Sequence, residues 1–458
     1  MRELQEKCAV FGAIGGPDCV ALTYIGLKAL QNRGQDHSGI AALQENGNVV
    51  VLKANGLVAS FCNKPRFKNL KGTISTGHNR YATAGASTLI NAQPHLSRNG
   101  KMALCANGDI VPSETSYWRH EMECKGFPLV SSNDGELHMR IVEWRISEGG
   151  TPFEALQFLV RNVTGAFSGT LIANNQLIAF RDPRGTRPLV FGTRSDGYSF
   201  VASEDCALKK LMVDSWDEIK PGEVRLIDQD GAISSSVEPY QKQAKCVFCG
   251  IYIANPQSTI FGIPVSLNRK RQGAKLSRFI PEDADIIIPV PDTSNHAALG
   301  LSQATGIPFE FGIIRPHHQG RSFIEPTQAK RLRVVDEKLI PDEEIIRGKR
   351  IVLVDDSIVR ATTLKLLIEK LRRADPIKIH VLIVAPVMTH PCFYGVATPT
   401  SEELIGANMS VEEIRVHIGA DTLAYLTVED HREIIASFGE NPDGYCFACS
   451  NGDYPTKL

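Results

Sequence analysis

The sequence predicts a layered domain of α-helices and β-strands, followed by an α/β domain built on a parallel sheet. The first half alternates short β-rich runs with Gly- and Asn-marked turns and two helical stretches. From Asp285 onward, apolar strands alternate with helical segments, which is typical of a parallel sheet covered by helices. Because 458 residues exceed what one hydrophobic core usually fills, we expect two domains.

Short segments in each half are expected to form strands. Those of the first half are rich in β-branched and apolar residues and occupy residues 49–52, 177–180, 199–202 and 223–227. Those of the second half are apolar runs at residues 286–288, 309–314, 351–354 and 381–385. After Thr363, the apolar positions of a helix that packs one face on the sheet follow the i, i+3, i+4, i+7 rule: Leu364, Leu367, Ile368 and Leu371. Residues 241–264 are expected to connect the halves, and the tail after Pro399 is expected to be helical with a Cys-rich end.

The composition excludes several classes of protein. The formal net charge is -1, without the basic surplus of a protein that binds nucleic acid through its phosphates. No segment approaches the ~18 apolar residues needed to cross a bilayer, and the charged opening MRELQEK lacks the apolar stretch of a secretory signal. We therefore expect a cytoplasmic protein, in which the 11 cysteines serve catalysis or metal binding rather than disulfides.

Cys8 is the first candidate catalytic residue, although a lone cysteine in an apolar run is more often simply buried. Two further segments favour a functional role. Arg80, among small residues, carries a planar guanidinium that suits the α-carboxylate of an amino acid. Asn107 and Gly108 supply an amide donor and an approachable backbone N–H, as an oxyanion hole requires. Asp134 is a candidate partner for the ammonium group of the same substrate.

Residues 350–363 form a second candidate site, in which an apolar strand, two acids and a short loop precede a helix. The backbone N–H groups and hydroxyls at such a helix N-terminus can bind a phosphate. Asp355 and Asp356 suit ribose hydroxyls, either directly or through a hydrated Mg²⁺. The segment therefore predicts binding of a phosphorylated sugar.

The cysteines near the C-terminus form a third candidate site. Cys446 and Cys449 are one turn apart, whereas Cys246 and Cys392 are distant in sequence. Four soft ligands suit a tetrahedral Zn²⁺ or an iron–sulfur cluster, and spacing alone does not choose between them. Cys249 is treated as a spare. The other cysteines are expected to be small buried hydrophobes: Cys19, Cys62, Cys105, Cys124 and Cys206.

Nearly the whole chain resembles the glutamine phosphoribosylpyrophosphate amidotransferases, through the segments around Cys8, Arg80, Asn107 and Asp134 and through residues 31–35, 182–189 and 201–204. For the last three segments the alternative is loop architecture around the site. The resemblance implies a four-layer αββα sandwich of the N-terminal-nucleophile type at residues 8–240, after removal of a propeptide at residues 1–7. It also implies that Cys8, with its own α-amino group as the base, forms a glutamyl thioester and releases ammonia. Asn107 and Gly108 then match the oxyanion positions, and Arg80 and Asp134 match the glutamine-binding ones.

Residues 350–363 resemble the signature of type I phosphoribosyltransferases, which implies such a domain, with C-terminal helices and a metal-cluster tail, at residues 241–458. The residues that the resemblance assigns to the phosphoribosyl pyrophosphate donor are Asp355, Asp356, Ser357, Arg360, Thr362, Thr363 and Arg321. It also implies Mg²⁺ at Thr293, Asp355 and Asp356, and a [4Fe–4S] cluster on Cys246, Cys392, Cys446 and Cys449. The implied activity is synthesis of 5-phosphoribosylamine from glutamine and phosphoribosyl pyrophosphate, the first step of purine synthesis, by a homotetramer that purine nucleotides inhibit.

The sequence also departs from this family. Ala9, Ala106 and Asp109 replace Gly, His and Asn, and none of these changes removes a required chemical group. In the donor half, Ala361 replaces a Gly, Pro289 removes a backbone N–H, and the closing loop differs at residues 316–318, at Asp336 and at Glu343. These changes motivate two alternatives: a divergent paralogue that aminates another phosphosugar or acceptor, and a phosphoribosyl-sensing module.

A basic stretch at residues 268–278 includes Arg269, Lys270, Arg271, Lys275 and Arg278. Such a stretch is more often a solvated helix face than a site. The alternative is a binding site for an anionic nucleotide inhibitor.

Overall fold

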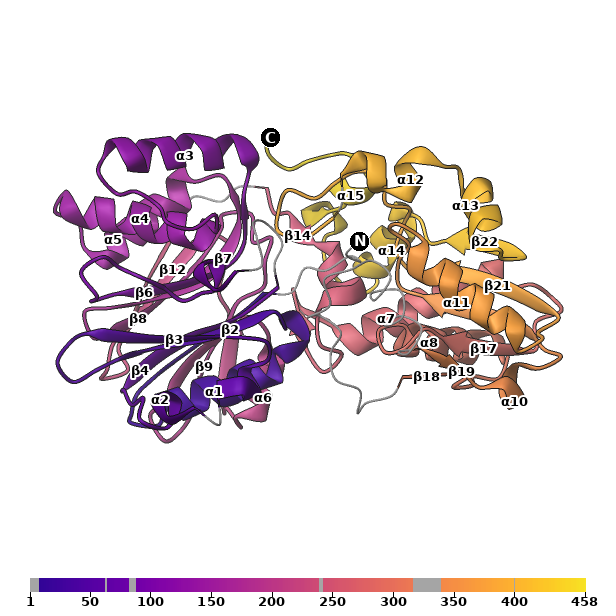
Figure 1. The fold of residues 1–458 in the computed structure, drawn as a ribbon, viewed down its shortest axis with the longest axis horizontal. Helices are drawn as coiled ribbons and strands as arrows, with labels where there is room; N and C mark the ends of the chain where they lie inside the picture. Colours follow the sequence, from indigo (N-terminus) through magenta and orange to yellow (C-terminus); the bar gives the residue numbers. More distant parts are fainter. Residues whose placement is uncertain (1–7, 62–63, 82–87, 239–241, 316–338, 399) are drawn as a thin grey trace.

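The computed structural model describes residues 8–61, 64–81, 88–238, 242–315, 339–398 and 400–458. The N-terminal half, in indigo and magenta, and the C-terminal half, in orange and yellow, lie side by side (Figure 1). No helix in these described ranges is long and apolar enough to cross a membrane.

Two β-sheets form the centre of the N-terminal half. The first has the strand order β11 (Ser215–Glu218), β9 (Val190–Thr193), β10 (Ser199–Ala202), β1 (Ala9–Ile14), β4 (Ile74–Arg80), β2 (His37–Leu43) and β3 (Val49–Asn55). The second has the order β13 (Ile233–Val237), β12 (Glu223–Ile227), β8 (Gln176–Arg181), β7 (Gly165–Ala173), β6 (Ala103–Ile110) and β5 (His95–Leu96). The strands expected at 49–52, 177–180, 199–202 and 223–227 are therefore confirmed.

Helices cover the outer face of each sheet, so the half has four layers (Figure 1). Those on the first sheet are α1 (Cys19–Ala29), α2 (Pro65–Lys68) and α6 (Asp205–Lys210); those on the second are α3 (Pro112–Cys124), α4 (Asp134–Ser147) and α5 (Pro152–Asn162). The strand β1 shows why the layers form. Ala9, Phe11 and Ala13 pack in the core beneath α1, whereas Ile14 packs in the core between the sheets. The predicted αββα class is confirmed, although the described residues of this half form six α-helices where two helical stretches were expected.

The C-terminal half contains a four-stranded parallel sheet, in the order β17 (Ile286–Pro289), β20 (Arg350–Asp355), β21 (Lys378–Ile383) and β22 (Thr422–Tyr425). Two separate cores, one on each face of the sheet, show that helices cover both faces. The helices are α7 (Val265–Lys275), α8 (Asn295–Thr305), α10 (Glu343–Ile346), α11 (Thr362–Arg373), α12 (Ile405–Asn408), α13 (Val411–Ile418), α14 (Val428–Ala436) and α15 (Ala448–Asn451). The apolar face predicted for α11 is confirmed, since its members Leu364, Leu367, Ile368 and Leu371 are all buried.

Two expectations for this half were wrong. Residues 309–314 do not form one strand: Phe309 makes a single bridge to Ile287, and only β18 (Ile313–Ile314) pairs, with β19 (Ile340–Pro341). The tail contributes the strand β22 to the sheet, whereas only helices were predicted there. The connecting segment is itself structured, with β14 (Lys245–Cys246), a π-helical turn η4 (Cys249–Ile253) and the hairpin β15 (Thr259–Ile260) and β16 (Ile263–Pro264).

Candidate functional site

Cys8 lies directly before β1, and its side chain is buried with 9% exposure. β1 runs antiparallel to β4 with Ala9 opposite Asn79, so Cys8 comes beside Arg80 at the end of β4. The Cys8 Sγ lies 3.7 Å from the carbonyl oxygen of Tyr81, the residue after Arg80. The Arg80 side chain is also buried, with 2% exposure. The fold thus brings the candidate nucleophile and the candidate carboxylate clamp together.

Asn107 and Gly108 lie on β6 and are tied to the strand of the nucleophile. The Asn107 Nδ2 donates to the Ser203 Oγ at 2.8 Å, and the same Oγ accepts from the backbone N–H of Val10 at 2.8 Å. Gly108 has φ +93°, and a Cβ at this position would lie 1.8 Å from the carbonyl oxygen of Ala166. Only glycine fits there, because any side chain would clash with the neighbouring strand. An amide donor and a bare backbone therefore stand beside the strand that begins after Cys8.

Asp134 is the first residue of α4, where its Oδ2 accepts from the backbone N–H of Ile110 at 2.9 Å. The pKa of Asp134 is raised to about 7, mainly by burial and secondly by the nearby carboxylate of Asp109. Burial likewise raises the pKa of Asp109, against the opposing charges of Arg187 and Arg80. Two buried carboxylates and one buried guanidinium thus share an electrostatic environment, which suits the ammonium and carboxylate ends of an amino acid.

The second candidate site lies where β20 meets α11. The Thr293 hydroxyl donates to the Asp356 Oδ2, the Ser357 hydroxyl donates to the Asp356 Oδ1 at 2.6 Å, and the Ser294 hydroxyl lies 3.5 Å from the Asp355 Oδ1. Thr293, Asp355 and Asp356, the residues that sequence analysis assigned to Mg²⁺, therefore converge. Thr362 and Thr363 belong to the first turn of the twelve-residue helix α11, and the backbone N–H groups at a helix N-terminus suit a phosphate.

Ala361, the residue before α11, adopts a left-handed conformation with φ 59° and ψ -5°. This is the conformation for which glycine is preferred, so the substitution carries a strain of about 1–2 kcal/mol. Arg360 is turned away from the loop in this structure, since its Nη2 donates to the Glu403 Oε2 at 2.6 Å. Arg321 and the rest of residues 316–338 lie outside the described residues.

The four cysteines assigned to a cluster line one cavity of about 420 Å³, together with Arg187 and several apolar side chains. Cys246 on β14 and Cys446 on β23 (Tyr445–Cys446) face each other in a parallel pair. The backbone carbonyl of Cys449 accepts from the N–H of His390, two residues before Cys392, at 3.1 Å. Within the described part of the chain, no group of three or more His, Cys, Asp or Glu side chains is arranged to hold a metal ion. The cysteines therefore surround a common space without converging on one point.

One further expectation about an individual side chain was wrong. Cys124 is exposed, because it lies on the solvent side of α3, whereas Cys19, Cys105 and Cys206 are buried as expected. Cys62 lies outside the described residues. The basic stretch is a solvated face in part, since Arg271 and Arg278 are exposed whereas Arg269 is buried. Its Lys275 and Arg278 form ion pairs with Glu433 and Asp430 of α14.

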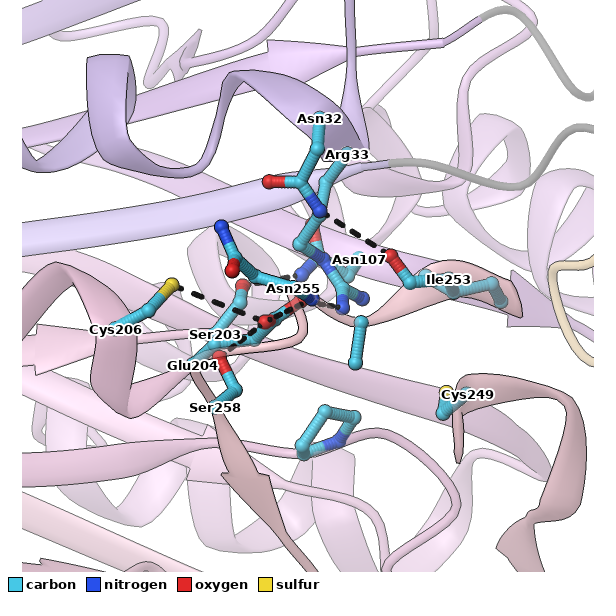
Figure 2. A network of polar contacts seen from close by, with 12 residues as sticks. Asn32, Arg33, Asn107, Ser203, Glu204, Cys206, Cys249, Ile253, Asn255 and Ser258 are labelled. Atoms are coloured by element: carbon cyan, nitrogen blue, oxygen red, sulfur yellow. Dashed lines mark hydrogen bonds and ion pairs between the residues drawn. The ribbon is translucent and has the colours of Figure 1, made fainter. Parts of the chain in front are cut away.

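Sequence analysis did not assign roles to Arg33, Ser203 and Glu204. Figure 2 shows these side chains in one polar network beside Asn107. The signal was present in residues 31–35 and 201–204, which were noted only for their resemblance. Their partners are remote in sequence, so no local pattern reveals the contacts.

Comparison with known proteins matches both halves. A family model described as a glutamine amidotransferase domain matches residues 78–210, and one described as a phosphoribosyl transferase domain matches residues 267–396. A chloroplastic amidophosphoribosyltransferase of Arabidopsis thaliana is 38% identical over 455 residues, covering 99% of this chain and 79% of the relative. The amidophosphoribosyltransferase of Bacillus subtilis is 37% identical over 462 residues, covering 100% of this chain and 96% of the relative. The solved structure of the glutamine phosphoribosylpyrophosphate amidotransferase from B. subtilis, complexed with ADP and GMP, has a TM-score of 0.89 at 36% identity and covers 98% of each chain.

Proposed function

The chain belongs to the amidophosphoribosyltransferase family, and from this premise we propose how its residues carry out the reaction. The enzyme takes nitrogen from glutamine and a phosphoribosyl group from phosphoribosyl pyrophosphate, and forms 5-phosphoribosylamine in the first step of purine biosynthesis. The observation that carries this conclusion is 37% identity to an amidophosphoribosyltransferase over 100% of the chain, across both candidate sites. No comparison favours the two alternatives, a divergent paralogue or a phosphoribosyl-sensing module.

In the glutaminase half, Cys8 acts after residues 1–7 have been removed, so that its own α-amino group can accept the thiol proton. The sulfur attacks the side-chain carbonyl of glutamine, and the developing oxyanion is stabilised by the Asn107 amide and the Gly108 N–H. The C–N bond then breaks, ammonia leaves, and a glutamyl thioester remains until water hydrolyses it to glutamate. Arg80 binds the α-carboxylate and Asp134 binds the α-ammonium of the substrate.

In the donor half, the ribose and its 5′-phosphate bind the loop and the N-terminus of α11, through Ser357, Thr362 and Thr363. Ammonia attacks the anomeric carbon as pyrophosphate leaves. A bound Mg²⁺ would neutralise pyrophosphate charge, and Thr293, Asp355 and Asp356 would hold it through oxygen atoms, the ligand type this ion prefers. Arg360 is also proposed to bind the donor, after a rearrangement that brings it away from Glu403. Arg321, outside the described residues, is kept as a proposed donor residue.

Cys246, Cys392, Cys446 and Cys449 are proposed to hold a [4Fe–4S] cluster. A single zinc ion needs four sulfurs at about 2.3 Å from one point, and no group of three or more of the described His, Cys, Asp or Glu side chains is arranged in that way. The buried Arg187 lines the same cavity as the four cysteines, where its charge would compensate the thiolates. The cluster would tie the C-terminal tail to β14 and so stabilise the fold.

The regulatory ligands and the assembly of the enzyme are proposed from the family relationship. Since a relative of 36% identity was solved with ADP and GMP, purine nucleotides are proposed as ligands of this enzyme too. The basic stretch on α7 is a poor candidate for this site, because its Lys275 and Arg278 are already neutralised by α14. A homotetramer, a boundary near residue 240 and a cytoplasmic location stay predictions.

A coupled assay on protein purified without oxygen tests the proposed function. Phosphoribosyl pyrophosphate with glutamine should yield pyrophosphate and glutamate, and the Cys8→Ala variant should lose this reaction while it still uses ammonia. If phosphoribosyl pyrophosphate does not stimulate glutamine hydrolysis and no pyrophosphate is released, the proposal is contradicted and the divergent paralogue is favoured.

A further inference from the structure

A buried ion pair between Arg33 and Glu204 contacts the backbone of the candidate nucleophile. The Arg33 Nη1 lies 2.6 Å from the Glu204 Oε1, and both side chains are almost inaccessible, with 1% and 0% exposure. The Arg33 Nε donates to the backbone carbonyl oxygen of Cys8 at 2.9 Å. The guanidinium therefore divides its donors between the residue that bears the nucleophile and one carboxylate. Any movement of Glu204 changes where Arg33 holds the Cys8 carbonyl.

The other oxygen of Glu204 reaches across to the segment that leads into the phosphoribosyltransferase half. The Glu204 Oε2 accepts from the backbone N–H of Asn255 at 2.8 Å and from the Ser258 hydroxyl at 2.6 Å. A further contact runs beside these two, since the Asn32 Nδ2 donates to the carbonyl oxygen of Ile253 at 3.2 Å. Figure 2 shows Glu204 in contact with Arg33, Asn255 and Ser258. One carboxylate thus joins the two halves of the chain.

Arg269 extends this connection toward the donor loop. Its side chain is buried with 2% exposure, and its Nη2 donates to the carbonyl oxygen of Ala254, next to Asn255, at 2.9 Å. Burial lowers the pKa of Arg269 to about 10, and the carboxylates of Asp356 and Glu204 act in the opposite direction. Arg269 lies on α7, which packs on α8 so closely that a Cβ at Gly300 of α8 would lie 2.1 Å from the carbonyl oxygen of Lys270. α8 begins directly after Thr293 and Ser294, and the Thr293 hydroxyl donates to Asp356 of the donor loop. The packing of α7 on α8 therefore connects Arg269 to the donor loop.

We propose that Arg33, Glu204 and Arg269 are positioning residues that set the position of Cys8 according to the state of the donor loop. The proposal rests on the proposed function, since it needs both sites to be active. An ion pair that served only as structural support would not need to contact both the carbonyl of the nucleophile and the segment that leads into the other half. The ordered path is Cys8, Arg33, Glu204, the segment 254–258, Arg269 and Asp356.

Glu204→Gln tests the relay, because it keeps the size of the side chain and removes its charge. We expect kcat for glutamine hydrolysis to fall about tenfold while KM for glutamine changes less than about twofold, since the substrate-binding residues are untouched. Activity with ammonia should be retained. Glu223→Gln is the matched control, because Glu223 is an equally buried glutamate that pairs with Arg225 on the second sheet. It should leave all of these parameters near the wild-type values.

Ser258→Ala provides an independent variant outside both candidate sites. It removes the 2.6 Å hydrogen bond to Glu204, and the basal hydrolysis of glutamine should stay within about twofold of wild type. The stimulation of hydrolysis by phosphoribosyl pyrophosphate should fall about fivefold, which lies in the usual range of coupling between sites. This readout would not move if the contact were only structural.

The outcomes separate the relay from the function on which it rests. Wild-type enzyme that releases no pyrophosphate overturns the proposed function. Wild-type enzyme that does so, with both variants stimulated as strongly as wild type, overturns the relay alone. A Glu204→Gln variant whose glutamine- and ammonia-dependent activities fall by the same factor also overturns it, because that result indicates loss of folded protein.

Discussion

The carboxylate of Asp109 offers a sharp test of the glutamine site, because it lies beside the group proposed to bind the substrate ammonium. Asp134 must be ionised for that role, and its pKa is raised to about 7, first by burial and then by Asp109. Protonation below this value removes the charge, so kcat/KM for glutamine should decline as pH falls through 7. At pH 6 only about a tenth of Asp134 is ionised.

Asp109→Asn removes the negative charge that is the second cause of the raised Asp134 pKa. It also restores an amide at a position where the family carries Asn. We expect the pH below which kcat/KM for glutamine declines, the acid limb, to move lower by about 1 unit. This shift corresponds to a repulsion of about 1.4 kcal/mol between the two carboxylates. About half of Asp134 is then ionised at pH 6, so kcat/KM for glutamine should rise roughly fivefold there and change little above about pH 8.

The measurement is glutamine hydrolysis at low substrate concentration across this pH range. Asp230→Asn is the control, since Asp230 is an exposed carboxylate of the same half and should leave the limb in place. An acid limb that stays at the same pH in Asp109→Asn would refute the reasoning. A fall in rate at every pH would also count against it, because it would mean that Asp109 itself holds the substrate.

Three further predictions concern the other candidate residues. A glutamine-like electrophile should attach to wild-type protein at Cys8 after loss of residues 1–7, and mass spectrometry of Cys8→Ala should find no adduct; equal labelling of both would exclude Cys8. Cys446→Ser should reduce bound iron and acid-labile sulfide and bleach the broad visible absorption, whereas a colourless wild-type preparation containing zinc would contradict the cluster. Ala361→Gly should change the free energy of unfolding by less than about 1 kcal/mol, because relief of about 1–2 kcal/mol of left-handed strain is offset by loss of a buried methyl worth about 0.8 kcal/mol and by the entropy of glycine, about 0.5–1 kcal/mol. Urea unfolding measures this difference. A fall of several kcal/mol in the free energy of unfolding would contradict this balance and show that the methyl group has a larger packing role.

Local sequence signals predicted the fold best where burial is uniform. The apolar strands β17 and β20 and the amphipathic helix α11 were predicted nearly to their ends, since their neighbours in the sheet require continuous burial. The strand expected at residues 381–385 exists as β21, but it begins three residues earlier, at Lys378, and ends at Ile383. β22 was missed because it is short and only Tyr425 in it is buried. Residues 309–314 were wrongly predicted as a strand, because apolar residues there include the exposed Phe311 and Ile314.

The candidate site was predictable only in part, for a related reason. Cys8, Arg80, Asn107 and Asp134 carry recognisable chemical groups, so their types and motifs indicated a role before any geometry was known. Arg33 and Glu204 lie 171 residues apart, and Glu204 and Ser258 lie 54 apart, so no sequence periodicity joins them. The ion pairs of the basic stretch on α7 were missed in the same way, because the acids that neutralise Lys275 lie more than 150 residues downstream.

The most direct test of the account follows nitrogen from glutamine to the product. Enzyme supplied with phosphoribosyl pyrophosphate, glutamine labelled with heavy nitrogen at its side-chain amide, and an excess of unlabelled ammonium should form phosphoribosylamine that carries the label in proportion to the glutamate produced. Product whose nitrogen instead matches the bulk ammonium would contradict transfer from the Cys8 site to the donor loop within one polypeptide.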